Sequence, residues 1–130
     1  MSITALLAWS AVLLSLMIVL AGLLKYEAWT WRGIQVMVSN RENVPPPSRL
    51  AGRADRAARN MIENLVLFAV LAAAVQFAGR EGGQAQLGAT IFFWARVAYW
   101  PVYLVGIVYV RTALWIIGTI GLAMMALALL

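Results

Sequence analysis

Four long apolar stretches constrain the fold of this chain more than any other feature. They cover residues 3–24, 58–78, 87–108 and 112–130. A helix needs roughly 20 mostly apolar residues to cross a hydrocarbon layer about 30 Å thick, because each residue rises about 1.5 Å. Four such stretches occupy most of the 130 residues. We therefore predict an all-α integral membrane protein, folded as a four-helix bundle in a single domain over residues 1–130.

The composition excludes several classes of function. Hydrophobic residues make up 64% of the chain and charged residues 12%, which is more apolar than an ordinary soluble domain. The net charge of +5 suits nucleic acid in principle, but a chain this apolar is not expected to bind it. With no cysteine and no histidine, the chain lacks a thiol nucleophile, an imidazole base and the usual soft metal ligands. We expect membrane lipids as its surroundings, with no nucleic-acid partner and no metal site.

The basic residues are concentrated in one segment, which predicts the orientation in the membrane. Seven of the ten lie between Lys25 and Arg59. Short loops rich in Lys and Arg stay on the cytoplasmic side, so we expect loop 25–56 to face the cytoplasm and both termini to lie opposite. The stretch 3–24 has no basic run before it and no small-residue cleavage pattern after it. It is therefore expected to be a retained span of a multi-pass protein.

The connections between the stretches are predicted from proline and glycine. The segment from Ser39 to Ser48 reads SNRENVPPPS, whose polar residues and three prolines predict the one real loop. Because no proline occurs earlier, the first helix is expected to continue toward Arg32. The glycines of 79–83 end the second span, and Pro101 predicts a kink in the third. Only Arg111 and its neighbours separate the last two spans, which predicts a tight antiparallel hairpin.

Two stripes of polar residues lie within the apolar stretches. An arginine near the centre of a membrane helix costs on the order of 2.5–3.5 kcal/mol, so each needs a partner or a wet cavity. The first stripe has spacing i, i+4, i+7, with two arginines at its flanks: Arg56, Asn60 and Glu63, then Arg53 and Arg59. The second has spacing i, i+3, i+7: Arg96, Tyr99 and Tyr103. We expect the stripes to face each other or a neighbouring subunit.

The first stripe has two interpretations, and both stay open. Asp55 with Arg59, and Arg59 with Glu63, have the i, i+4 spacing of weak ion pairs that merely let a helix insert. The arginines outnumber the carboxylates, however, and a planar guanidinium binds carboxylates at two points, so an anionic ligand would balance the set. Tyr99 and Tyr103 suit either a site or an aromatic core. We expect Arg96 to pair with a carboxylate of the second span.

Arg111 stands where the fourth apolar stretch begins. A helix N-terminus presents unpaired amides and partial positive charge, so an anion beside this arginine would be stabilised twice. A thiol at such a position should lose its proton more easily. The alternative is an arginine that extends to the membrane surface and closes a short loop. Trp115, one turn later, fits either a wall of the site or the interfacial belt.

Three segments resemble the MAPEG family, the membrane-associated proteins of eicosanoid and glutathione metabolism. RADRAARNMIENLVLFAVL, residues 53–71, is similar to the family signature, and NRENVPPP to the loop of its bacterial members. ARVAYWPVYLVGIVYVRT, residues 95–112, is similar to the third helix and the arginine that opens the fourth. The resemblance implies a homotrimer of four-helix subunits in a bacterial inner membrane. It also implies that glutathione binds as co-substrate between neighbouring subunits.

The resemblance also implies roles for the residues in the stripes. Arg111 would be the catalytic group that keeps the glutathione thiol ionised. Glutathione itself would be held by the remaining polar residues, with the carboxylate of Glu63 on its amino group: Arg32, Arg53, Arg56, Arg59, Asn60, Glu63, Tyr99 and Tyr103. The thiolate would then attack an apolar, lipid-like second substrate that approaches from the bilayer.

The leading hypothesis is therefore a membrane-bound, glutathione-dependent transferase or peroxidase acting on apolar electrophiles or lipid hydroperoxides. A second hypothesis is a non-catalytic lipid-binding or scaffolding protein with the same fold, whose arginines bind lipid headgroups. A third is a small multidrug exporter. The third is disfavoured because such exporters usually need a carboxylate in the first span, and residues 3–24 contain none.

Overall fold

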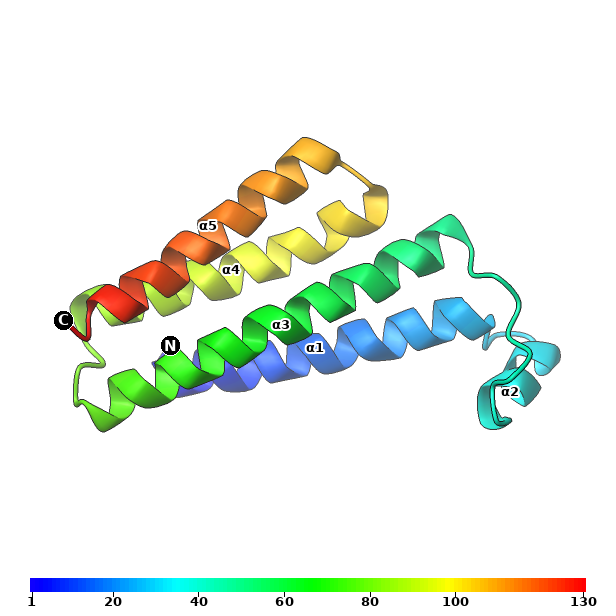
Figure 1. Ribbon diagram of the computed structural model, residues 1–130, viewed down its shortest axis with the longest axis horizontal. Coiled ribbons are helices and arrows are strands. Elements are labelled where there is room, and N and C mark those ends of the chain that lie inside the picture. The colour runs from blue at the N-terminus through cyan, green and yellow to red at the C-terminus, as the bar shows by residue number, and fades with distance from the viewer.

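The structure is a computed structural model that describes all 130 residues, and its regular elements are all helices. They are α1 (Ile3–Tyr26), α2 (Trp31–Val38), α3 (Arg49–Phe77), α4 (Gly83–Val105) and α5 (Val108–Leu127). The four long helices lie side by side, α1 against α3 and α4 against α5, while the short α2 lies beyond the end of α1 (Figure 1). Both chain termini lie at the opposite end from α2 (Figure 1).

Three helices are long and apolar enough to cross a membrane: α1, α3 and α5, with 24, 29 and 20 residues. The fourth long helix, α4, has 23 residues but carries two glutamines and Arg96, and it is not one of the three. The outer faces of the helices expose many large apolar side chains, among them Trp9, Val66 and Ile120. The chain is therefore an integral membrane protein with three candidate spans and one further long helix packed among them.

The prediction that the first helix continues toward Arg32 is wrong. Glu27 adopts a left-handed conformation (φ 49°, ψ 52°), and its N–H donates to the carbonyl of Leu23, which closes the last turn of α1. A new helix then begins at Trp31. The Thr30 hydroxyl accepts a hydrogen bond from the Gly33 N–H at 2.9 Å, so α2 has its own N-terminal cap.

The other connections follow the proline and glycine pattern. Residues 39–48 contain no helix, and α3 begins directly after them with the Ser48 hydroxyl accepting from the Ala51 N–H at 3.1 Å. The polar segment before residue 58 is therefore helical and extends α3 beyond the apolar stretch. Between α4 and α5 the chain turns through Gly106, whose φ of 89° favours glycine, and Ile107. This turn places Arg111 in the first turn of α5.

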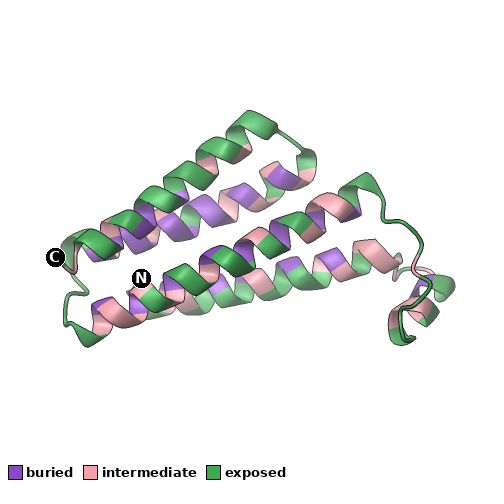
Figure 2. Ribbon diagram, in the orientation of Figure 1, coloured by how far each residue is buried: buried purple, intermediate pink, exposed green.

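Close backbone contact joins α4 to α5. A Cβ atom added at Gly88 would lie 2.5 Å from the carbonyl oxygen of Gly121, and the reverse distance is also 2.5 Å. Aromatic packing joins α3 to α4, since the Phe68 and Phe92 rings have centroids 4.5 Å apart. The buried residues lie where the four long helices face one another (Figure 2). A smaller buried cluster that includes Met61, Tyr99 and Tyr103 extends this core toward the end that carries α2.

Candidate functional site

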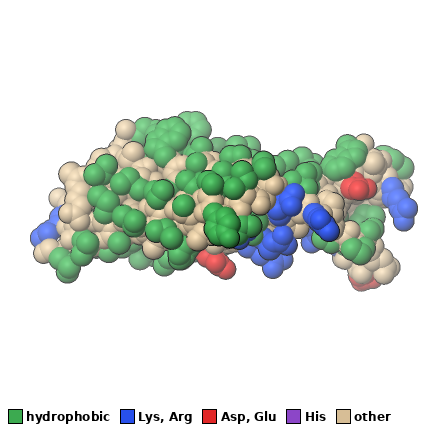
Figure 3. All heavy atoms as spheres, turned by 90° about the horizontal axis from the view of Figure 1, so that it is seen from above, with side chains coloured by type: hydrophobic (Ala, Val, Ile, Leu, Met, Phe, Trp, Pro, Cys, Tyr) green, Lys and Arg blue, Asp and Glu red, His purple; other side chains and the backbone are tan.

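Basic side chains gather at one end of the molecule. This end contains the C-terminus of α1, all of α2, the N-terminus of α3 and the turn between α4 and α5. In the space-filling view most basic groups lie toward the α2 end (Figure 3). Arg80 lies at the other end, where its Nη1 donates to the Ala128 carbonyl. Of the ten basic residues, only Arg59 has a carboxylate within 4.0 Å. This end therefore carries positive charge that the chain does not neutralise by ion pairing.

A hollow of about 290 Å³ opens among α3, α4 and α5 at this end. Its lining includes four predicted site residues, together with Trp115, the expected candidate for a wall of the site, and Thr112: Asn60, Tyr99, Tyr103, Arg111, Trp115 and Thr112. The two polar stripes therefore do meet within one chain, through Asn60 on α3 and the tyrosine pair on α4. Tyr99 and Tyr103 are buried, with ring centroids 5.4 Å apart, so they form the floor of the hollow rather than an exposed aromatic belt.

Arg111 is the one basic residue that lines this hollow, and it has no carboxylate partner. Its guanidinium carbon lies 4.7 Å from the centroid of the Tyr103 ring, a cation–π distance. Its backbone N–H already donates to the Ile107 carbonyl, at 3.2 Å, whereas no side chain caps the amides at the start of α5. An arginine without a carboxylate, beside an uncapped helix N-terminus, is an arrangement that stabilises an anion.

Behind the hollow, Arg96 is buried and holds Asn60. Its Nη1 donates to the Asn60 Oδ1 at 2.7 Å. The expectation that Arg96 pairs with a carboxylate of the second span is therefore wrong, because Glu63 lies on the exposed part of α3 and an amide takes its place. Only 1% of Arg96 is exposed, and its Nε and Nη2 have no hydrogen-bond partner. The rings of Phe92 and Tyr99 lie 5.5 and 5.2 Å from its guanidinium carbon.

The hydrogen bonds of Asn60 fix which end of its amide is free. The oxygen accepts from Arg96, and the Asn64 Nδ2 lies 3.4 Å from the same oxygen and 2.8 Å from the Asn60 backbone carbonyl. Because the oxygen is occupied, the NH₂ group is the part left to donate to a ligand. The arrangement therefore presents a hydrogen-bond donor beside Arg111.

Arg53 and Arg56 line a second hollow of about 350 Å³, at the N-terminus of α3. Arg53 also crosses to α4, where its Nε donates to the Leu104 carbonyl at 2.9 Å. That carbonyl belongs to the last turn of α4, whose carbonyls lack partners within the helix. Arg53 thus connects α3 to the turn that carries Arg111, in addition to any contact with a ligand.

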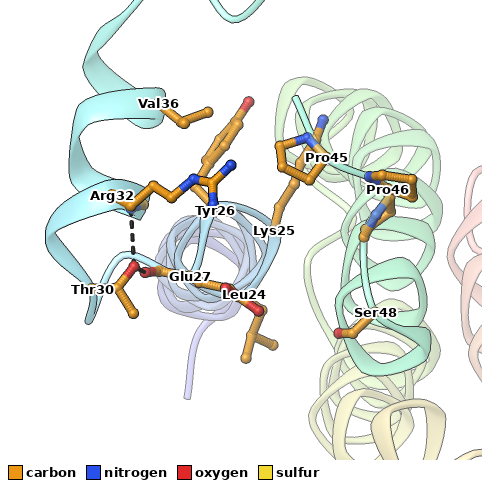
Figure 4. A pocket seen from close by; sticks show the side chains of 12 residues that line it. Leu24, Lys25, Tyr26, Glu27, Thr30, Arg32, Val36, Pro45, Pro46 and Ser48 are labelled. Carbon is orange, nitrogen blue, oxygen red and sulfur yellow. Dashed lines mark hydrogen bonds between the residues drawn. The ribbon is translucent and has the colours of Figure 1, made fainter. Parts of the chain in front are cut away.

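The other predicted residues lie apart from Arg111. Arg59 pairs with Asp55 at 3.0 Å, as the structural interpretation expected, but no Arg59–Glu63 ion pair forms. Glu63 is exposed and lines none of the hollows described above. Arg32 lines a third hollow, of about 290 Å³, with Lys25, Tyr26 and the prolines of the loop (Figure 4). A single chain therefore brings together Asn60, Tyr99, Tyr103 and Arg111, but not the full predicted set.

Two residues that shape the site were missed at the sequence level. Asn64 is buried on α3 and supports Asn60. Gly118 on α5 faces the guanidinium of Arg96, since an added Cβ would lie 3.5 Å from its Nε. The signal for both was present: Asn64 falls on the same helical face as Asn60, and Gly118 and Gly121 mark a close contact between helices.

Comparison with known proteins supports the resemblance seen in the motifs. The model of the MAPEG family matches residues 3–130, essentially the whole chain. No match is found among curated proteins or among solved structures. The match covers the second-helix motif, the tyrosine pair and Arg111 together. The chain therefore belongs to the MAPEG family, and it is a membrane protein of this glutathione- and eicosanoid-related family.

Proposed function

We propose that the protein is a membrane-bound, glutathione-dependent transferase or peroxidase that acts on apolar electrophiles or lipid hydroperoxides. The observation that carries this proposal is the hollow in which Arg111, without a carboxylate partner, lies beside two buried tyrosines and the held amide of Asn60. The chain has no cysteine, so the reacting thiol must come from a bound molecule. Family membership makes glutathione the first choice for that molecule.

In the proposed reaction Arg111 and the start of α5 stabilise the thiolate of glutathione. Ionised sulfur, not the neutral thiol, is the nucleophile, and positive charge nearby lowers the cost of ionising it. With a carbon electrophile, the thiolate forms a sulfur–carbon bond and the leaving group departs with the bonding electrons. With a hydroperoxide, the thiolate attacks the terminal oxygen, the O–O bond breaks and the alcohol leaves, and a second glutathione converts the sulfenic acid to disulfide and water. Arg111 stays close to the sulfur throughout, so it also stabilises charge as it redistributes in the transition state.

The rest of the predicted set would bind the two ends of glutathione. Glu63 pairs with the amino group in this proposal, while Arg56, with its neighbours Arg53 and Arg59, binds carboxylate. Arg32 lies in a separate hollow of the same chain, so it would reach the ligand from a neighbouring subunit. We therefore propose a homotrimer of four-helix subunits, each with four spans, in which adjacent subunits complete each site.

The test is a glutathione titration followed by thiolate absorbance in the ultraviolet, with turnover of an apolar electrophile as the second readout. Arg111→Ala should remove the absorbance and lower kcat by about 10²-fold or more, the usual cost of losing a group that stabilises developing charge. Arg80→Ala, at the opposite end of the molecule, is the control and should change neither. The proposal fails if wild type shows no thiolate signal and Arg111→Ala has full activity. Co-purified anionic lipid that glutathione does not displace would instead favour the lipid-binding protein.

The same proposal places loop 25–56 in the cytoplasm of a bacterium and both termini across the inner membrane. The concentration of basic residues at the α2 end supports this orientation. Because the chain has no cysteine, single cysteines at Ser2 and Asn43 can be labelled separately with a membrane-impermeant maleimide in intact cells. Labelling of Ser2→Cys alone would agree with this orientation, and labelling of Asn43→Cys alone would reverse it.

A further inference from the structure

The short helix α2 packs against the chain by one side only. Gly33 is its single buried residue, and among the helices α2 contacts only α1. A Cβ atom at Gly33 would lie 2.1 Å from the carbonyl oxygens of both Tyr26 and Glu27. These are backbone atoms that cannot rotate away, so only glycine allows α2 to lie this close to the end of α1. The orientation of α2 is therefore fixed by its contact with a candidate membrane span.

An apolar stripe runs along α2 beside the Gly33 contact, with two exposed residues and the half-buried Ile34, and no other helix covers it. Trp31, Ile34 and Val38 have the spacing i, i+3, i+7, which places them within about 60° of one another at about 100° per residue. Trp31 and Val38 are 73% and 75% exposed, and Trp29, just before the helix, is 67% exposed. We call Trp31, Ile34 and Val38 the α2 stripe. An exposed apolar stripe on a helix this short needs an occupant other than water.

The surroundings of the stripe identify that occupant as lipid. The candidate span α1 ends at Tyr26, so α2 begins at the depth where the hydrocarbon layer gives way to headgroups. Tryptophan is enriched at that depth because its ring is both apolar and polar. Arg32 lies beside Tyr26, with Lys25 and the loop prolines around it (Figure 4). The Arg41 guanidinium carbon lies 5.2 Å from the Tyr26 ring centroid. Cations next to an apolar helical face are typical of helices that bind anionic membrane surfaces.

We propose that α2 lies in the headgroup layer at the basic end of the molecule, with the α2 stripe inserted toward the acyl chains and Lys25 and Arg41 bound to anionic lipid headgroups. The contact at Gly33 sets the angle at which α2 enters this layer. This inference does not depend on glutathione or on any catalytic activity.

The test uses spin labels, because the chain has no cysteine and each introduced thiol is unique. Val38→Cys lies on the stripe, and Arg32→Cys is the matched control, exposed on the polar side of the same helix about 120° from Val38. The full-length protein is labelled and placed in phosphatidylcholine vesicles with and without phosphatidylserine. Accessibility to oxygen, which concentrates in lipid, is compared with accessibility to a water-soluble nickel chelate.

The oxygen-to-nickel accessibility ratio should be several-fold higher at position 38 than at position 32, and phosphatidylserine should widen the difference. In the variant Lys25→Gln with Arg41→Gln, the phosphatidylserine effect should disappear while the contrast between positions 38 and 32 seen in phosphatidylcholine alone persists. Equal ratios at the two positions would overturn the proposal. So would strong spin–spin broadening at position 38 that vanishes on dilution with unlabelled protein, since a second copy of the chain would then cover the stripe.

Gly33→Ala provides a separate test of the fixed orientation. Its Cβ cannot be accommodated, so α2 must move from the end of α1 and the contrast between positions 38 and 32 should fall severalfold. The midpoint of thermal unfolding should change little, because α2 contacts no other helix. A variant that keeps the full contrast would show that Gly33 does not set the angle of α2.

Discussion

The close approach of α4 and α5 gives the most quantitative prediction, for Gly121→Ala. The new Cβ would lie 2.5 Å from the Gly88 carbonyl oxygen and 2.9 Å from the Phe92 backbone nitrogen. Both are backbone atoms, so no side-chain rotation relieves the contact. An ordinary contact begins at 3.4 Å, and the difference from 2.5 Å means that the helices must separate locally by about 0.9 Å.

The expected cost follows from two opposing effects. Overpacking of this kind typically costs about 1–3 kcal/mol. Replacing glycine with alanine inside a helix returns about 0.5–1 kcal/mol, because the unfolded chain loses freedom. The net loss of unfolding free energy is therefore between about 0 and 2.5 kcal/mol, which for a domain of this size lowers Tm by up to about 10 °C.

The matched control is Gly22→Ala on α1, where an added Cβ meets no heavy atom within 4 Å. The exchange is chemically identical, so only the gain in helix propensity remains, and Tm should rise or stay unchanged. Thermal unfolding of both variants is followed by circular dichroism in the same detergent. If Gly121→Ala is as stable as Gly22→Ala, the close approach of the two helices is refuted.

A double-mutant cycle sharpens the test. Gly88→Ala should cost about as much as Gly121→Ala, since its Cβ would lie 2.5 Å from the Gly121 carbonyl oxygen. Once either substitution has separated the helices, the second should cost less, so the double variant should be more stable than the sum of the single costs predicts. Strictly additive costs would mean that the two glycines do not share one contact.

Three further predictions concern the hydrogen bonds that build the site. Arg53→Ala removes the hydrogen bond to the Leu104 carbonyl and should weaken the thiolate signal of bound glutathione. Arg53→Lys should restore part of the signal, and an unchanged signal in Arg53→Ala would exclude a role for this bond. Arg96→Met replaces a guanidinium that has two unpartnered nitrogens, each costing about 1–3 kcal/mol when buried, so Tm should rise. Glutathione affinity should fall because Asn60 loses its partner, and a lower Tm would contradict the prediction. Ser48→Ala removes the N-cap of α3 and should lower the free energy of unfolding by about 1 kcal/mol in thermal unfolding experiments. Ser15→Ala, whose hydroxyl bonds only within α1, is the control and should lower it little. Equal losses would mean that the cap contributes nothing.

The helices were predictable where local signals decide them. Apolar length placed the long helices, and the three prolines with their polar neighbours ended helix between Ser39 and Ser48. The break at Glu27 was not predictable in the same way, because a left-handed glutamate has no strong sequence signature. Gly33 lies inside the regular helix that follows this break. A glycine is needed there because α2 contacts the end of α1, and the sequence alone does not reveal that tertiary contact.

The sequence predicted most of the residues that line the hollow, but it did not predict which of them would form hydrogen bonds with one another. Periodicity shows that Tyr99 and Tyr103 share one face of their helix and that Asn60 lies on a polar face of its own helix. It does not show how each helix is turned about its axis, and so which faces meet. Charge pairing favoured a carboxylate for Arg96. Packing decided otherwise, because Gly118 leaves space for a buried guanidinium near Asn60, whereas Glu63 faces outward.

The burial of Arg96 and the freedom of Arg111 are two parts of one arrangement. Burying an arginine with two unpartnered nitrogens is costly, so its presence here calls for a function. Its single hydrogen bond holds the oxygen of the Asn60 amide, and this leaves the amide NH₂ as the free donor in the hollow. Arg111 has no carboxylate partner either. The side chains that line the hollow therefore offer a ligand hydrogen-bond donors, and their hydroxyl groups can donate as well as accept. An acceptor-rich ligand such as a thiolate peptide fits that chemistry, and an ammonium or other cationic ligand does not.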